Sequence, residues 1–249
     1  MDTHFKVITS FYNVETWIRA TVNSLLLQTY KNFECILTDD MSTDKSSEYI
    51  NELIKEDSRF TLVQNEEKST ALTNNVNAIE RSRPSDQDVI VILDGDDWLA
   101  SPLSLEILNN AYRFKKCWMT YGSYIEYPSG RRGDFCKQVP KSVIEENSFR
   151  DIPWVFSHLK TFKYALWKQI KGDDLVDPKT GKHFTKTQDL AFMYPMLEMS
   201  GHNTAFIDEA LCVYNLANPL NDHKVDHTEQ LRMESYIRGK QKYLPMKEL

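Results

Sequence analysis

The sequence has few cysteines and no close pair of them. Its four cysteines, Cys35, Cys117, Cys136 and Cys212, are scattered and form no C-x-x-C motif. This spacing excludes an ordinary zinc ribbon, and so few cysteines in a chain of this length do not indicate a disulfide framework. We expect four free thiols and a reducing compartment.

An excess of basic residues and a long apolar run are also missing. The chain has 30 lysines and arginines against 36 acidic residues, for a net charge of -6, which argues against nucleic acid as the main partner because binding phosphates needs a basic face. No apolar run approaches the roughly 18 residues of a membrane span. The polar start, residues 1–4, does not resemble a signal peptide. A soluble cytoplasmic protein is expected.

Internal repeats and stretches of linker composition are absent as well. Hydrophobic residues make up 41% of the 249 residues and charged residues 27%, which is ordinary for a globular protein. A chain of this length can bury about three-quarters of its unfolded surface. We therefore expect one domain over residues 1–249.

Short apolar runs alternate with longer amphipathic patterns along the first hundred residues. The expected strands are 6–11, 33–38, 60–63 and 88–93, and the expected helices are 14–27, 45–54 and 71–81. Such alternation predicts an α/β protein whose mostly parallel sheet is covered by helices. The apolar run in 88–93 is typical of a fully buried central strand.

The periodicity weakens after residue 101. We expect a helix of about a dozen residues after Pro102, an antiparallel strand at 118–127, helices at 161–170 and 187–199, and a strand at 203–214. From about Glu229 an amphipathic helix carries Arg232, Arg238, Lys240, Lys242 and Lys247. Such a basic stripe is either a solvated face or a surface for a partner or an anionic membrane.

Polar residues follow three of the expected strands, at 10–13, 39–40 and 94–97. Ligands of open α/β sheets bind outside the carboxyl ends of the strands, so these clusters are expected to meet at one cleft. At 94–97, three carboxylates within four residues would repel one another without a cation. Mn²⁺ or Mg²⁺ fits, since both prefer oxygen ligands and bind substrate phosphates. The alternative is an acidic turn that only caps the next helix.

Four segments in this order resemble family 2 glycosyltransferases of the GT-A fold. They are residues 7–13 (VITSFYN), 24–34 (SLLLQTYKNFE), 37–44 (LTDDMSTD) and 93–98 (LDGDDW). The resemblance implies a Rossmann-like, mostly parallel central sheet flanked by helices, with a small antiparallel portion on the acceptor side. It divides the domain into a nucleotide-binding half (1–100), an acceptor and catalytic half (101–228) and a C-terminal helix (229–249).

The resemblance also implies roles for individual residues. The segment of Ser10, Phe11 and Tyr12 would line the base pocket, and Asp39 would hydrogen-bond the uracil ring. Asp94 would reach the ribose or the metal, and Asp96 would bind the metal that bridges the diphosphate. Gly95, between them, lets the backbone turn sharply and approach the ligand closely.

The sequence departs from the family pattern at two positions. Ser10 replaces the usual proline, and the segment 72–75 lacks the usual arginine. The family's acidic motif resembles residues 187–190, where Asp189 would deprotonate the acceptor hydroxyl for a displacement with inversion. From the residues alone, Asp189 could equally be an acid favoured at a helix start.

Two weaker candidates lie in the second half. Trp154, His158 and Lys160 combine aromatic and basic side chains that suit a sugar-binding acceptor wall, although aromatic clusters are also typical of a core. A loop at 215–227 could close over the donor phosphates, with His223 as a metal ligand and Lys224 as a countercharge.

These features predict a metal-dependent, inverting hexosyltransferase that uses a nucleotide-diphosphate sugar, most plausibly a UDP-sugar, and a glycan, free or protein-linked, or another hydroxyl acceptor. One alternative is a nucleotidyltransferase or sugar-nucleotide pyrophosphorylase, but its usual Gly-rich basic loop after the first strand is replaced here by residues 12–15, Tyr-Asn-Val-Glu. The other is an inactive carbohydrate-binding domain, which the retained carboxylates disfavour.

Overall fold

The protein is described by a computed structural model over residues 2–220 and 227–249. In these residues the strands of the main sheet lie in the order β3-β2-β1-β4-β7-β6-β10-β5. Their bounds are β1 (Phe5–Phe11), β2 (Phe33–Asp39), β3 (Phe60–Gln64), β4 (Val89–Ile92), β5 (Trp98–Leu99), β6 (Met119–Tyr127), β7 (Lys160–Lys163) and β10 (Thr204–Asn215). A second, two-stranded sheet pairs β8 (Val176–Asp177) with β9 (Lys182–His183).

The main sheet is parallel in its first half and mixed in its second. β1 pairs in parallel with both β2 and β4, and β2 pairs in parallel with β3. β7 runs antiparallel between β4 and β6, whereas β6 and β10 are parallel to each other. The predicted fold class, a mostly parallel sheet with a smaller antiparallel portion, is confirmed.

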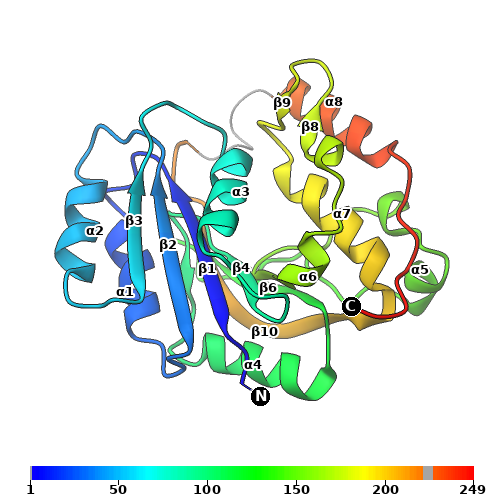
Figure 1. The fold of residues 1–249 in the computed structure, drawn as a ribbon, viewed down its shortest axis with the longest axis horizontal. Coiled ribbons are helices and arrows are strands. Elements are labelled where there is room, and N and C mark those ends of the chain that lie inside the picture. The colour runs from blue at the N-terminus through cyan, green and yellow to red at the C-terminus, as the bar shows by residue number, and fades with distance from the viewer. Residues whose placement is uncertain (1, 221–226) are drawn as a thin grey trace.

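Helices cover both faces of this sheet (Figure 1). Their bounds are α1 (Ile18–Leu26), α2 (Ser46–Ile54), α3 (Ala71–Arg81), α4 (Ser104–Lys115), α5 (Lys141–Glu145), α6 (Tyr164–Trp167), α7 (Gln188–Ser200) and α8 (His227–Arg238). The buried side chains of α1, α2 and α4 belong to one core cluster, and those of α3, α6 and α7 belong to the other.

The central strand β4 explains why two cores form. Val89 and Val91 point into the cluster that contains α1, and Ile90 and Ile92 point into the cluster that contains α3 and α7. Successive side chains of a strand face opposite sides of its sheet. A run that is apolar at every position is therefore buried on both faces, as the sequence predicted.

The prediction of a helix over residues 161–170 is wrong for most of that segment. Lys160–Lys163 is strand β7, and only the four residues of α6 that follow are helical. The strand is inserted between β4 and β6, so both of its edges are hydrogen-bonded and Phe162 is fully buried. These long-range pairings outweigh the local helical pattern. For the same reason β6, expected to be antiparallel, has one antiparallel and one parallel neighbour.

The C-terminal helix is shorter than expected, since α8 ends at Arg238 and residues 240–249 are irregular apart from two bends. Several contacts hold this tail. The backbone N–H of Tyr243 donates to Glu198 and that of Met246 donates to the carbonyl of Met199. Tertiary hydrogen bonds therefore replace helical ones beyond Gly239.

Four of the five basic residues in the expected stripe form ion pairs with other residues of the protein. Their partners are Asp177 and Glu229 for Arg232, Glu234 for Arg238, Asp174 for Lys240 and Asp151 for Lys242. Four of the five charges are thus engaged internally, so the stripe is mainly a structural feature of this domain.

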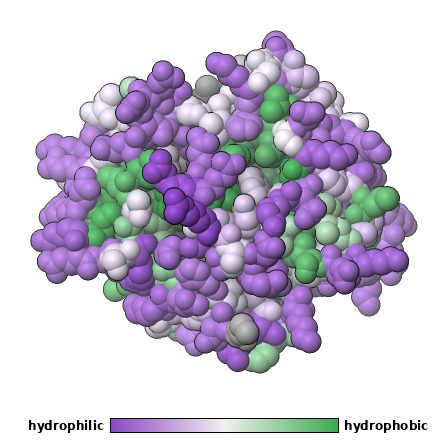
Figure 2. Space-filling view, viewed as in Figure 1, coloured by the Kyte–Doolittle hydropathy of each residue, from purple (hydrophilic) through white to green (hydrophobic). Residues whose placement is uncertain are grey.

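The surface is ordinary for a globular protein. On the face shown in Figure 2, hydrophilic residues predominate and hydrophobic ones form scattered patches. None of the helices in the described residues is both long enough and apolar enough to cross a bilayer.

Candidate active site

A cavity of about 830 Å³ opens at the carboxyl ends of β1 and β4. Ser10, Asp40 and Asp94 line it, so the three polar clusters that follow the first strands do meet there. On its other side the cavity is lined by the start of α7 and by side chains of α8, which the sequence places more than ninety residues away.

Residues after β1 form one end of the cavity, where Ser10, Phe11 and Tyr12 all line it as predicted. Tyr12 is 38% exposed, and the Lys68 ammonium lies over its ring. The Ser10 hydroxyl donates to Asn75 Oδ1 at 2.6 Å. The two departures from the family pattern therefore contact each other, because Asn75 belongs to the segment that lacks the arginine.

Of the two aspartates at the end of β2, Asp40 lines the cavity and Asp39 does not. Asp39 is buried, and its carboxylate accepts hydrogen bonds from the Ser42 backbone and the Ser47 hydroxyl. Asp40 accepts hydrogen bonds from Asn65 and the backbone of Ser69. The contact with a base stays a prediction for Asp39, and Asp40 is the member of the pair that the cavity exposes.

Gly95 is required by backbone packing. A β-carbon added there would lie 2.3 Å from the β-carbon of Phe11, far inside van der Waals contact. Its backbone N–H donates to the Ser10 carbonyl at 3.1 Å, and its carbonyl accepts from the Thr21 hydroxyl at 2.9 Å. The glycine therefore lets the acidic segment lie directly against the end of β1, and the expected turn is also present, since the Asp97 backbone N–H donates to the Asp94 carbonyl at 3.0 Å.

Asp94 lies next to two buried basic side chains. Its Oδ2 is 3.6 Å from His158 Nε2 and 4.0 Å from Lys160 Nζ. Burial alone would raise the pKa of Asp94, but the charge of Lys160 and the proximity of His158 outweigh it and lower the pKa to about 2. Asp94 is thus ionised, and Lys160 supplies part of the compensating charge that we had assigned to a metal.

The other two acids of the segment are anchored by asparagines near the end of β10. Asn218 Nδ2 donates to Asp96 Oδ2 at 2.7 Å, and the Asn215 backbone donates to Asp97 Oδ1 at 2.8 Å. Burial and the charge of Asp94 raise the pKa of Asp96 to about 6, against the opposing effect of Asn218. Burial and the two neighbouring aspartates raise the pKa of Asp97 well above its usual range.

His158 completes a group of potential metal ligands. One ligand atom from each of Asp94, Asp97 and His158 lies within 4.8 Å of the others. His158 Nε2 and Asp97 Oδ2 are buried and have no hydrogen-bond partner in the described part of the chain. Two orphaned atoms beside an ionised carboxylate fit a divalent cation. Burial and the charge of Lys160 lower the pKa of His158, which favours the neutral imidazole that a metal binds.

The predicted catalytic base lies across from this group. Asp189, in the first turn of α7, lines the cavity and accepts a hydrogen bond from Lys160 Nζ at 2.9 Å. The side chain of Lys160 is only 2% exposed and does not line the cavity. Its ammonium lies close to both Asp189 and Asp94. Of the expected acceptor wall, Trp154 and His158 line the cavity, whereas Lys160 lies beneath it.

Some candidate site residues were not predicted from the sequence, and two predicted ones lie outside the described residues. Asp97 was passed over for the metal, although it belongs to the same acidic run, and Asn215 and Asn218 carried no sequence signal because their role depends on β10. His223 and Lys224 lie outside the residues that the structure describes. Of the expected metal ligands, Asp94 belongs to the candidate group of the described residues, Asp96 lines the cavity beside it, and His223 is not described.

A mixed α/β sheet with acidic residues at its carboxyl edge is typical of enzymes that bind nucleotide diphosphates. The family model for glycosyl transferase family 2 matches residues 6–211. The chain therefore belongs to glycosyl transferase family 2 and is a glycosyltransferase domain.

Relatives support the same assignment. A glucosyltransferase of Escherichia coli, the UDP-Glc:alpha-D-GlcNAc-diphosphoundecaprenol beta-1,3-glucosyltransferase WfaP, is 34% identical over 66% of this chain and 68% of its own length. The glycosyltransferase GlyG of Streptococcus pneumoniae is 29% identical over 86% of this chain and 71% of its own length. For other relatives the match is shorter, and it covers only 14% of the pneumococcal GlyA and 46% of an uncharacterized Haemophilus influenzae glycosyltransferase.

Solved structures share the fold. S. aureus TarS 1-349 in complex with UDP-GlcNAc superposes with a TM-score of 0.68 at 17% identity, over 94% of this chain and 66% of TarS 1-349. The mannosyltransferase PcManGT from Pyrobaculum calidifontis, in complex with GDP-Man and Mn2+, gives a TM-score of 0.58 at 16% identity, over 88% of this chain and 59% of that one. At these identities the likeness concerns the fold alone.

Proposed function

We propose that this chain catalyses the transfer of a sugar, with inversion, from a UDP-sugar to a hydroxyl group of an acceptor glycan, with Mn²⁺ or Mg²⁺ as cofactor. One observation carries the proposal. A single cavity contains the end of β1, the ionised Asp94 and, across from it, Asp189. A donor and an acceptor bound side by side in this cavity would have a carboxylate within reach of each.

The donor end of the cavity follows from the contacts described above. Tyr12 and Phe11 offer aromatic surface to a base, and Asp40 offers a carboxylate to its N–H group. UDP-GlcNAc bound to TarS and the UDP-Glc in the name of WfaP make uridine our first choice.

The metal would be held by Asp94, Asp97 and His158, with Asp96 beside them. A divalent cation there supplies Lewis-acid stabilisation of the charge that develops on a leaving diphosphate. Asp94 is ready for this role because it is already ionised. Asp97 would have to lose its proton, so metal binding should release protons and weaken at low pH.

Asp189 would take the proton of the acceptor hydroxyl. Its carboxylate accepts a hydrogen bond from Lys160, which fixes its orientation. Because Lys160 contacts only Oδ2 of Asp189, Oδ1 remains the natural proton acceptor. The presence of this carboxylate supports a catalytic domain over an inactive binding domain.

Donor binding can be tested without knowing the acceptor. Thermal shift with UDP, GDP, dTDP and CDP and their sugar conjugates, each with and without Mn²⁺, should show the largest stabilisation for one uridine ligand with metal. A ligand at a hundredfold excess over its Kd stabilises the native state by about 2.7 kcal/mol. If none of the nucleotides stabilises the protein, the proposal is contradicted.

Asp189→Asn tests the base. We expect donor affinity to stay within about twofold and turnover to fall by about 10²- to 10⁴-fold, because a base is removed and no donor contact is lost. Hydrolysis of the donor or transfer to a sugar acceptor provides the readout. Asp173→Asn, on an exposed residue, is the matched control and should behave as the wild type. Normal turnover in Asp189→Asn would place the base elsewhere.

A further inference from the structure

The C-terminal helix α8 contributes side chains to the cavity. Its residues Gln230 and Glu234 line the cavity. So do Trp154 and Gln188, which is the first residue of α7. None of the family motifs includes α8, and the match to the family model ends at residue 211. Gln188 directly precedes Asp189 in the chain, so this part of the lining adjoins the predicted base. What these four residues bind is therefore a separate question from donor recognition.

Two of these residues carry polar atoms without a partner. The Oε1 atoms of Gln188 and Gln230 are both buried and have no hydrogen-bond partner among the described residues. Buried polar atoms nearly always have one. Each amide can accept a hydrogen bond through its oxygen and donate through its nitrogen. Two such amides in one cavity suit a ligand that carries several hydroxyl groups.

Trp154 supplies the apolar part of such a site. Its ring meets Phe156 and Tyr194 edge to face, with centroid distances of 5.3 Å in both cases. These contacts hold the indole in place while it borders the cavity. A pyranose has an apolar C–H face that packs on an aromatic ring and a rim of hydroxyls that bond to amides and carboxylates.

The cavity offers no lysine or arginine side chain to an anionic group at this position. Six acidic residues line it, Asp40, Asp94, Asp96, Glu126, Asp189 and Glu234. No lysine or arginine appears among the lining residues that the structure describes. The basic side chains nearest to Asp189 and Glu234, Lys160 and Arg238, are already paired with these two acids. An uncharged ligand is therefore favoured.

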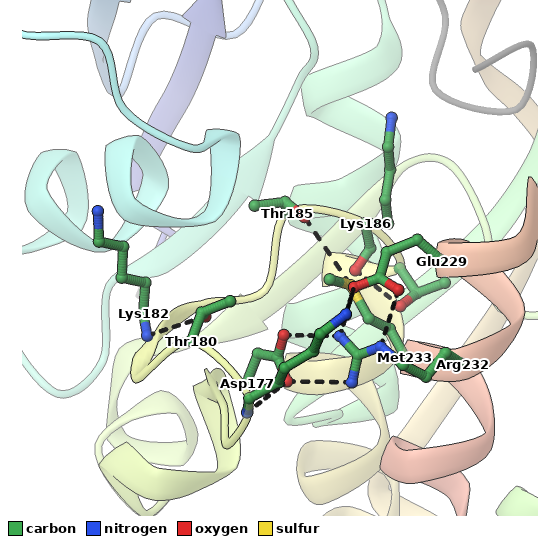
Figure 3. A network of polar contacts seen from close by, with 10 residues as sticks. Asp177, Thr180, Lys182, Thr185, Lys186, Glu229, Arg232 and Met233 are labelled. Atoms are coloured by element: carbon green, nitrogen blue, oxygen red, sulfur yellow. Dashed lines mark hydrogen bonds and ion pairs between the residues drawn. The ribbon is translucent and has the colours of Figure 1, made fainter. Parts of the chain in front are cut away.

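Helix α8 is held firmly enough to serve as a wall. Arg232 bonds to Asp177 across a gap of 55 residues and to Glu229 on its own helix (Figure 3). At the other end, Arg150 donates to the Ile237 carbonyl at 2.6 Å. Glu234 is fixed by Arg238, whose guanidinium lies 2.8 Å from it. The polar groups that face the cavity are thus pre-positioned, which lowers the entropic cost of binding.

We propose that Gln188, Gln230, Glu234 and Trp154 form a subsite for an uncharged pyranose residue. As an acceptor site it rests on the proposed function, because its ligand would present a hydroxyl to Asp189. Pyranose binding itself does not depend on turnover. A sugar that carries a phosphate at C1 is expected to bind less well than the same sugar as a methyl glycoside.

The test uses the full chain loaded with UDP and Mn²⁺. Saturation-transfer NMR would measure the binding of methyl pyranosides of glucose, galactose and N-acetylglucosamine, and of N-acetylglucosamine 1-phosphate. We expect at least one methyl glycoside to bind, and Gln230→Ala and Gln188→Ala to weaken it about fivefold to tenfold, as the loss of a hydrogen bond implies. Gln241→Ala, on an exposed glutamine just beyond α8, is the matched control and should bind as the wild type.

Three results would overturn the subsite. These are no binding by any methyl glycoside, unchanged binding by both glutamine variants, and tighter binding by the 1-phosphate. Melting temperatures of the variants within about 2 °C of the wild type would show that they fold. Stabilisation by UDP with Mn²⁺, measured on the same samples, separates this proposal from the first. If UDP binds and no glycoside does, only the subsite fails, whereas glycoside binding without any nucleotide effect contradicts the donor assignment.

Discussion

Lys160 joins two carboxylates that belong to distant parts of the chain. Its ammonium lies 2.9 Å from Asp189 and 4.0 Å from Asp94, and its side chain is 2% exposed. This buried cation lowers the pKa of Asp94 and links the two side chains. The spacing of the two acids in the cavity therefore depends on a residue that does not itself line the cavity.

Lys160→Met is expected to destabilise the protein by on the order of 3 kcal/mol, because it leaves the carboxylates without their buried partner. Mn²⁺ should restore part of the loss, since it can neutralise Asp94 instead. Urea unfolding with and without Mn²⁺ measures both effects. Lys163→Met on the same strand, where the ammonium contacts only Gln87, is the control and should cost little. An equal, metal-independent loss in both variants would argue against this role of Lys160.

The raised pKa of Asp96 predicts how the stability of the protein depends on pH. Its pKa is raised from 3.8 to about 6, so between these values the folded protein binds a proton that the unfolded chain has lost. The free energy of unfolding should therefore fall as the pH rises from 4 to 6, by up to about 3 kcal/mol for this group. Asp96→Asn should lessen the fall. Identical slopes in wild type and variant would contradict the shift.

At the scale of elements, the first half of the chain could be predicted and the second half only in part. Strands β1 to β4 and helix α3 follow from local periodicity, because the apolar pattern of each element is regular over its length. Strand β7 could not be found this way, because its partners β4 and β6 precede it by dozens of residues. The same holds within the site, where Asp94 and Asp189 carry motif signals but Asn218, Lys160 and Gln230 acquire their roles only through tertiary contacts.

The buried pair of Arg150 and Glu198 ties several elements together. Glu198, on α7, is fully buried and also accepts from the Tyr243 backbone, while Arg150 also donates to α8. Glu198→Ala would leave a buried guanidinium without its counterion. We expect a loss of about 3–5 kcal/mol in the free energy of unfolding, measured by urea denaturation. Glu80→Ala, on an exposed residue of α3, should change stability by less than about 0.5 kcal/mol. A similar effect of both changes would show that the pair is dispensable.

At the scale of the whole molecule, the cavity is built from both ends of the chain. β10 lies between β6 and β5, and the segment that follows it holds Asp96 and Asp97. A protein that ends at residue 203 would keep every acid of the family motifs but lose β10 and both asparagines. We expect it not to bind UDP with Mn²⁺ in calorimetry. UDP binding by this shortened chain with the affinity of the full chain would refute the dependence on β10.

The link between Asp97 and Asn215 spans 118 residues, and this has a consequence for how the protein is made. Ribosomes add roughly 5–20 residues per second. The acidic segment therefore emerges at least about 6 seconds, and up to about 24 seconds, before the asparagines that anchor it. During that interval Asp96 and Asp97 lack the asparagines that donate hydrogen bonds to them in the folded protein. The nascent protein is thus an acidic, open α/β half, and its proposed nucleotide site can be completed only after Asn218 has been added.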